Sequence, residues 1–255
     1  MHALILAAGT GSRLQQRRPK CLLEVGGRPL LHHQVDALDE VGADQITLVL
    51  GYQWQRVETA LRGRGQVIVN ERYAVTNSLY SFWMARNAIE DGVLVMNSDV
   101  LFDPALLRDL MDVEGSALAY DSTSGDDPEH MKVHTRNGRL LRMSKDLPPT
   151  YSHGENVGIV HLSAPAARAA ALAADQLVRQ GRGDDWVSAV FTQVASRHRI
   201  TCLDVAGRPW VEIDFPHDLE HARTRVWPAI EHAKNGHRLP DFVRTRPRHE
   251  TEIAT

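Results

Sequence analysis

An apolar strand that runs directly into a loop of small residues opens the chain and constrains its fold more than any other feature. Residues 3–6 are apolar, and the loop that follows reads Ala7-Ala8-Gly9-Thr10-Gly11-Ser12. Small side chains let a phosphate group approach the backbone, so that the N–H groups of residues 8–11 can donate to its oxygens. We therefore expect a buried strand whose carboxyl end, from Leu6 onward, carries a phosphate-binding loop.

Two basic residues follow the loop and favour a triphosphate ligand. Arg13 offers a planar fork of donors, and Lys20 offers a compact point charge. A dinucleotide-binding fingerprint would need a third glycine where Leu14 stands, and a kinase-type phosphate loop would need Gly-Lys-Ser/Thr after Gly11. A tight turn without a ligand is the remaining alternative, and it explains the glycines but not the two cations.

The same segment carries a resemblance to a known family. L-A-A-G-T-G-S-R-L, followed after a short gap by P-K-C-L-L-E-V-G-G-R-P-L-L, resembles the signature of nucleotidyltransferases that join a nucleoside triphosphate to a phosphorylated small molecule. The resemblance extends over about residues 1–225. It implies the sugar-phosphate nucleotidylyltransferase superfamily, with Arg13 and Lys20 gripping the triphosphate during catalysis.

Length and composition narrow the class of protein. The chain has 255 residues, 43% of them apolar, and a net charge of −3, so a nucleic-acid binder with a basic face is not expected. There is no run of about 18 apolar residues that could span a membrane, and the early first strand leaves no room for a signal peptide. Cys21 and Cys202 match no metal pattern. We predict a cytoplasmic protein with two reduced thiols.

The order of elements predicts an α/β fold. Because short apolar strands alternate with helices in the first hundred residues, we expect a Rossmann-like, doubly wound, mostly parallel sheet, followed by a mixed second half that binds the acceptor. The Asn137-Gly138 dipeptide predicts a hairpin. Strands are expected at residues 3–6, 45–50, 67–69, 93–96, 117–121, 131–143 (around that turn) and 156–162. Helices are expected at residues 29–41, 54–61, 78–89, 104–113, 165–180 and 184–196.

No linker interrupts this pattern, so we predict a single nucleotidyltransferase domain over residues 1–234. Residues 235–255 are polar, rich in arginine and without periodicity, which is typical of a loosely ordered tail.

Two aspartates are candidate metal ligands. Asp99 ends an apolar strand, and Asp214 lies in W-V-E-I-D-F-P-H-D-L. By the resemblance, both carboxylates hold Mg²⁺, a hard cation that prefers oxygen ligands, between the nucleotide and the acceptor phosphate. Asp99 can also be a turn residue, and Glu212 and Asp218 compete with Asp214 for the metal role.

Residues 70–81 bear on the base. Sugar-1-phosphate enzymes of the superfamily carry a Gln-x-x-Pro-x-Gly-Leu-Ala stretch here, which this chain lacks. N-x-x-Y-x-x-T-N-S-x-x-S is instead similar to the choline-phosphate and phosphonate cytidylyltransferases. Thr76, Asn77 and Ser78 can present polar groups to the base, although Ser78 can equally cap the helix that follows. The resemblance implies CTP.

The acceptor site is predicted from the second half of the chain. By the resemblance, Lys145 contacts the acceptor's phosphate and acts in catalysis, and Glu155 and Asn156 line the acceptor pocket. An ammonium at the far end of the acceptor would suit an acidic and aromatic wall, for which aromatic packing in the core is the alternative. The candidates for this wall are Tyr80, Asp184, Asp185, Trp186 and Trp210.

The sequence thus predicts an Mg²⁺-dependent cytidylyltransferase that transfers CMP from CTP to a small phosphonate or to phosphocholine. A sugar-1-phosphate nucleotidylyltransferase is the alternative among enzymes. A nucleotide-binding relative without turnover is the alternative outside them, and the joint presence of Arg13, Lys20, Asp99 and Asp214 argues against it.

Overall fold

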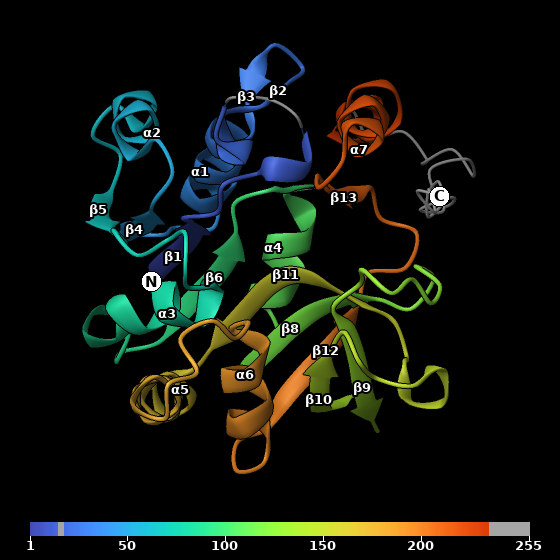
Figure 1. Ribbon diagram of the computed structural model, residues 1–255. Coiled ribbons are helices and arrows are strands. Elements are labelled where there is room, and N and C mark those ends of the chain that lie inside the picture. Colours follow the sequence, from blue (N-terminus) through green and yellow to red (C-terminus); the bar gives the residue numbers. More distant parts are fainter. Residues whose placement is uncertain (15–17, 235–255) are drawn as a thin grey trace, which may run out of the picture.

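A nine-stranded sheet organises the part of the chain, residues 1–14 and 18–234, that the computed structural model describes (Figure 1). Its strands lie in the order β5-β4-β1-β6-β11-β8-β12-β10-β9. In chain order they are β1 (His2–Ala7), β4 (Gln45–Leu50), β5 (Gln66–Val69), β6 (Val93–Asn97), β8 (Ser116–Asp121), β9 (Lys132–Arg136), β10 (Arg139–Ser144), β11 (Glu155–Leu162) and β12 (Ile200–Asp204).

The first four strands form the parallel half of the sheet. β1 lies between β4 and β6, with Leu6 opposite Val49 and Asn97, and β5 extends the sheet beyond β4. Parallel neighbours require crossover connections, which α1 (Leu30–Glu40), α2 (Trp54–Leu61) and α3 (Ser78–Met84) supply. The predicted doubly wound α/β fold is therefore confirmed.

The second half of the sheet is mixed, as predicted. β11 runs antiparallel to both β6 and β8, and β12 runs parallel to β8. β9 and β10 form the predicted hairpin, whose turn residues Asn137 and Gly138 both have positive φ, 52° and 66°. A break in register between Asn156 and Val160 of β11 lies beside the cavity described below.

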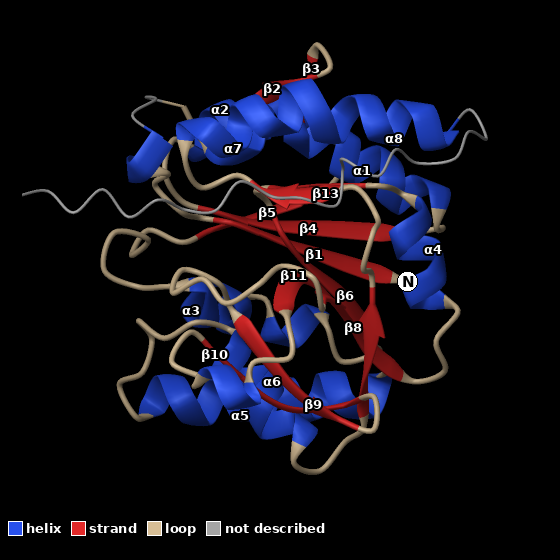
Figure 2. Ribbon diagram, turned by 90° about the vertical axis from the view of Figure 1, so that its right-hand side faces the viewer, coloured by secondary structure: helices blue, strands red, loops and turns tan. Residues whose placement is uncertain are grey.

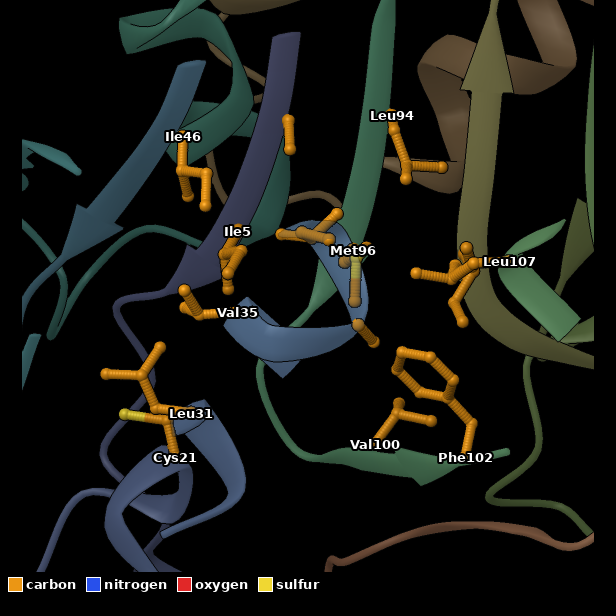
Figure 3. Packing of buried hydrophobic residues seen from close by; sticks show 14 of the residues in the cluster. Ile5, Cys21, Leu31, Val35, Ile46, Leu94, Met96, Val100, Phe102 and Leu107 are labelled. Atoms are coloured by element: carbon orange, nitrogen blue, oxygen red, sulfur yellow. The ribbon is translucent and has the colours of Figure 1, made fainter. Parts of the chain in front are cut away.

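Helices cover both faces of the sheet (Figure 2). Alternate residues of β1 point to opposite faces, so that Ile5 belongs to a core under α1, α2 and α4 (Ala105–Met111), while Leu4 belongs to a core under α3, α5 (Ala164–Arg179) and α6 (Ser188–Ala195). Figure 3 shows the first core, where Val35 of α1 lies next to Ile5 and Leu31 of α1 lies next to Cys21.

A small pair of strands and the C-terminal helices form a third apolar core with the segment before α1. β7 (Val100–Phe102) pairs with β13 (Trp210–Glu212), and the chain continues into α7 (Pro216–His221) and α8 (Trp227–Lys234). A short hairpin, β2 (Glu24–Val25) with β3 (Arg28–Pro29), precedes α1. This packing brings residues 210–214 beside the end of β6.

Several predicted boundaries were wrong. The helix expected over residues 184–196 begins at Ser188, because the backbone of residues 183–187 bonds to the start of α3 instead: Gly183 O and Asp185 O accept from Asn77 N and Leu79 N. The helix expected over residues 78–89 ends at Met84 and continues as a short 3₁₀ turn. β2, β3, β7, β12, β13, α7 and α8 were not predicted.

The predicted tail, residues 235–255, lies outside the described residues. In residues 1–14 and 18–234, every helix is too short or too polar to cross a membrane.

Candidate active site

A cavity of about 250 Å³ opens at the carboxyl ends of β1 and β6. The loop after β1 contributes Ala7, Ala8, Gly9 and Gly11 to its wall, and Lys20 lies beside them. Gly11 has φ +63°, and a Cβ atom there would lie 3.1 Å from Lys20 Cγ, so this glycine leaves room for the lysine stem. Thr10, Ser12 and Arg13 of the predicted loop do not line this cavity.

A buried glutamine of α1 holds the turn that presents Asp99. Gln34 Nε2 donates to the carbonyl oxygens of Asn97 at 2.8 Å and Val100 at 2.9 Å, which flank Asp99 on either side. Ser98 N donates to Leu6 O, which ties this turn to the end of β1. No sequence pattern pointed to Gln34, since a polar residue on a helix is ordinarily exposed.

Asp214 is brought to Asp99 by backbone contacts. Ile213 N donates to Asp99 O at 2.9 Å, which fixes the segment after β13 beside the turn after β6. The N–H groups of Asp214 and Phe215 donate to Asp218 Oδ2 at 3.0 and 2.8 Å. Asp218, weighed above as a rival metal ligand, thus holds the Asp214 backbone in place at the start of α7.

The ammonium of Lys20 joins the two aspartates. Its Nζ donates to Asp99 Oδ2 at 3.0 Å and to Asp214 Oδ1. Burial works to lower the pKa of Lys20, but the carboxylates of Asp99 and Asp214 outweigh it and raise this pKa above its ordinary value. In turn, the Lys20 ammonium overcomes the effect of burial and lowers the pKa of Asp214. Both aspartates therefore direct a carboxylate oxygen toward one cation.

A third carboxyl group, Glu212, lies next to this cluster. Burial raises its pKa well above the ordinary value, and the nearby charges of Asp99 and Asp214 add to the effect. Asn97 Nδ2 lies 3.5 Å from Glu212 Oε1. The surroundings of Glu212 therefore favour the neutral form of its carboxyl group.

The loop before α3 forms the other wall of the cavity. Asn70 is buried, and its Nδ2 donates to Thr76 Oγ1 at 3.1 Å and to Ser81 Oγ at 3.2 Å. Thr76 Oγ1 itself donates to Arg72 O, so its hydroxyl proton is used within the loop. Ser78 Oγ accepts from Val187 N at 2.9 Å and keeps its own proton for a further bond. The predicted residues Thr76, Asn77 and Ser78 all line the cavity.

On the acceptor side, Lys145, Asn156 and Trp186 line the same cavity. Lys145 Nζ lies 5.1 Å from the centroid of the Trp186 ring, within the range of a cation–π contact. Asn156 Oδ1 is buried and has no hydrogen-bond partner among the residues that the structure describes. A buried amide oxygen of this kind can accept a bond from a ligand.

Other predicted acceptor residues lie elsewhere. Trp210 is buried, and its Nε1 donates to Asp121 Oδ2 at 2.8 Å, so the structure places the indole in the core and not in the wall of the cavity. Tyr80 packs on Trp83 and under the guanidinium of Arg72, outside the cavity.

Three acidic residues predicted on the acceptor side also lie away from it. Asp184 and Asp185 do not line the cavity, and Asp185 pairs with Arg182 at the surface. Glu155 is buried and faces a second cavity of about 410 Å³, which shares Glu129, Glu212 and Asp214 with the first.

Comparison with known proteins decides the family. The model of the MobA-like NTP transferase domain matches residues 3–251. The chain belongs to this family. The superfamily predicted from the N-terminal motif is thereby confirmed, and the family is one of nucleotidyltransferases.

Two relatives of the MobA-like domain show the range of similar proteins. A bifunctional IPC transferase and DIPP synthase from Aquifex aeolicus is 29% identical over 230 residues, which is 87% of this chain and 50% of the relative. A CMP-5'-(3-aminopropyl)phosphonate synthase from Streptomyces rubellomurinus is 38% identical over 128 residues, 47% of this chain and 20% of that protein. The chain thus spans half or less of the length of these two proteins.

Solved structures confirm the nucleotidyltransferase fold. The CTP:phosphocholine cytidylyltransferase of Streptococcus pneumoniae superposes with a TM-score of 0.71 and 21% identity, covering 87% of this chain and 97% of that one. The inositol-1-phosphate CTP transferase of T. maritima gives 0.73 and 22%, covering 93% and 97%.

Proposed function

We propose that the protein is a cytidylyltransferase, which transfers CMP from CTP to a small phosphonate or to a phosphocholine-like phosphate monoester in the cytoplasm. The observation that carries the proposal is the convergence of Lys20, Asp99 and Asp214 at the carboxyl edge of β1 and β6, between a small-residue loop and a lysine-bearing wall. The naming of cytidylyl transfer in three of the similar proteins supports the choice of CTP.

The reaction needs charge stabilisation more than acid or base. An oxygen of the acceptor forms a bond to the α-phosphorus, the bond from that phosphorus to the β-phosphate oxygen breaks, and pyrophosphate leaves with the electron pair. A phosphate monoester acceptor is largely dianionic near neutral pH, since its second pKa is about 6, and needs no general base. Lys20 and Arg13 would grip the triphosphate, and Lys145 would grip the acceptor's anion.

The aspartate pair fits a divalent cation. Asp99 and Asp214 both direct an oxygen at the Lys20 ammonium, so their carboxylates already converge on one positive charge. Mg²⁺ commonly takes one or two protein carboxylates and completes its shell with water and substrate phosphates. Bound there, Mg²⁺ would neutralise charge on the reacting phosphates.

The test is pyrophosphate release with Mg²⁺, crossing four nucleoside triphosphates with five acceptors. The acceptors are phosphocholine, 2-aminoethylphosphonate, 2-hydroxyethylphosphonate, glucose-1-phosphate and inositol-1-phosphate. Release with CTP and one of the first three supports the proposal and names the acceptor. Release with a sugar phosphate alone, or silence across the grid while CTP still binds, contradicts it and favours the sugar-phosphate or non-catalytic alternative.

Inositol-1-phosphate is included among the acceptors because of one similar structure. The T. maritima structure covers 93% of this chain and is named for inositol-1-phosphate, which is also a phosphate monoester. The cation proposed for the acceptor's anion, Lys145, suits that phosphate equally well. Release with CTP and inositol-1-phosphate only would keep the cytidylyl transfer and replace the acceptor.

A further inference from the structure

A single carboxylate oxygen holds together the two cations on which the proposed function relies. Glu129 Oε2 accepts from Arg13 Nη1 at 2.8 Å and from Lys145 Nζ at 3.2 Å. Glu129 lines both cavities of the site, where they join beside Asp214. Arg13, proposed to bind the triphosphate, and Lys145, proposed to bind the acceptor, therefore both contact the same carboxylate oxygen.

Aromatic rings hold both cations in place independently of Glu129. The Lys145 ammonium lies over Trp186, and the Arg13 guanidinium lies 5.4 Å from the centroid of the Phe215 ring. A cation held over a ring is less free to turn away into solvent. If the Glu129 side chain moved away, the two positive charges would thus still lie on either side of the position that its carboxylate had occupied.

The loop of residues 124–130, which carries Glu129, is anchored on both sides of it. Asp126 forms an ion pair with the buried Lys132 at 2.8 Å, and Asp127 Oδ1 accepts from Glu129 N at 2.8 Å. His130 lies 3.5 Å from the buried Glu155. These contacts keep the loop beside the site whether or not the Glu129 side chain is bound to the cations.

We propose that Glu129 is an internal stand-in for a substrate anion: its carboxylate occupies the position between Arg13 and Lys145 in the free protein and yields it to a phosphonate or phosphate oxygen. The identity of that anion rests on the proposed function. A dianionic phosphonate carries more charge than one carboxylate and can replace both of its bonds. The side chains of Arg13 and Glu129 are 49% and 38% exposed, and ion pairs that open to solvent are weak enough to exchange.

The exchange lowers the apparent affinity of the site for anions. A ligand binds only those molecules in which Glu129 has left the position. Its apparent Kd is therefore the intrinsic Kd divided by the fraction of such molecules. Glu129 would thus also keep the site from binding weak, singly charged anions.

The experiment measures binding of methylphosphonate to the full chain, without nucleotide or metal, by ³¹P NMR titration. Glu129→Gln keeps the size of the side chain and removes its charge, and we expect its Kd to fall roughly threefold to tenfold below that of the unmodified protein. Asp146→Asn is the matched control: Asp146 is exposed, follows Lys145 directly and lines neither cavity, so its Kd should stay unchanged.

Two results would overturn the inference. Equal or weaker binding by Glu129→Gln would show that the carboxylate does not compete for the position. An equal gain in Asp146→Asn would show a general effect of net charge. Because the titration involves no turnover, its outcome is independent of pyrophosphate release, and either proposal can fail while the other stands.

Discussion

A single ammonium group organises the carboxylates of the site. Lys20 contacts Asp99 and Asp214, whose positions are set by separate elements, α1 through Gln34 and α7 through Asp218. Each aspartate therefore has a support that does not depend on the other. Removing the charge of one should impair chemistry without dismantling the fold.

Asp99→Asn tests this at the level of the reaction. The variant keeps the shape of the side chain and removes one of two charges proposed to hold the metal, so we expect pyrophosphate release to fall at least about 100-fold. The thermal midpoint should stay near that of the unmodified protein. Asp91→Asn, at an exposed turn, is the control and should retain full activity. An active Asp99→Asn protein would contradict the metal assignment.

His33 gives a pH-dependent prediction away from the site. Burial lowers the pKa of His33 below its ordinary 6.5, even though its hydrogen bond to Val25 O favours the charged form. Since the folded-state pKa lies below the unfolded one, this neutral ring contributes stability above about pH 6.5, and the contribution is lost as pH falls through the folded-state pKa.

The measurement is the urea midpoint at pH 7.5 and pH 5.0. Glu and Asp side chains titrate in both proteins, so the comparison is with His33→Gln, whose amide can still donate to Val25 O. We expect the unmodified protein to lose more stability between the two pH values than the variant. An equal loss of stability in both proteins would mean that protonation of His33 does not contribute to the pH dependence.

At the scale of elements, the phosphate loop and the loop before α3 meet at Gly51. This residue follows β4, and a Cβ atom there would lie 2.5 Å from Tyr73 Cβ and 2.6 Å from Ala8 O. Real Cβ contacts are longer, so any side chain must push the two loops apart. Gly51 is therefore a joint between the segments proposed to hold phosphate and base.

Gly51→Ala should weaken the binding of the nucleotide and leave the binding of the acceptor nearly unchanged. We expect the KM for CTP to rise about tenfold, since one or two lost contacts in a base site of this kind account for about that factor. The KM for the acceptor, which is proposed to bind at the opposite wall, serves as the internal control and should change little. A rise of both constants together would indicate a general loss of folded protein.

The elements of the parallel half were predictable because each is a local pattern. β1, β4 and β6 are mostly apolar, as is typical of strands that are buried on both faces. Elements such as β7 and β13 were missed because each is only three residues long and is a strand only through its pairing with the other. Three residues are too few to show the alternation of apolar and polar side chains that identifies a strand. The predicted start of α6 was wrong for a related reason. The acidic residues 184 and 185 favour a helix N-terminus, but backbone hydrogen bonds to α3 hold this segment outside the helix.

The candidate site divides in the same way. Lys20, Asp99 and Asp214 lie in motifs, and the structure brings them together. Glu129 and Gln34 lie in no motif. Glu129 is 116 residues away from Arg13, and Gln34 is 63 residues away from Asn97, so only the folded chain relates these pairs. Trp210 lies in the core and not in the cavity wall, and the motif could not tell these apart, because an aromatic residue in a motif can pack in the core as well as against a ligand.

At the scale of the whole molecule, Trp210 connects the two halves. It belongs to β13, which pairs with β7 at the edge of the parallel half, and it donates to Asp121 at the end of β8 in the mixed half. Buried donors and charged acceptors that satisfy each other contribute more to stability than exposed pairs.

Trp210→Phe should therefore destabilise the protein by about 2 kcal/mol, because Asp121 loses a buried partner. Activity per folded molecule should stay unchanged, since Trp210 lies outside the cavity. Urea unfolding and pyrophosphate release measure the two effects. Trp186→Phe is the matched comparison and should leave stability nearly unchanged, because Trp186 is half exposed. A Trp210→Phe variant with normal stability and impaired acceptor KM would restore the original assignment.

The strand order of the sheet has a consequence for synthesis on the ribosome. β6 ends at residue 97, yet its second neighbour, β11, begins only at residue 155, and β12 enters between β8 and β10 from residue 200. A growing chain therefore carries an open strand edge for most of its translation, a state prone to wrong pairing. Asp214 emerges after all nine strands, so the nascent protein completes its scaffold before it can gather the charges that would bind a nucleotide.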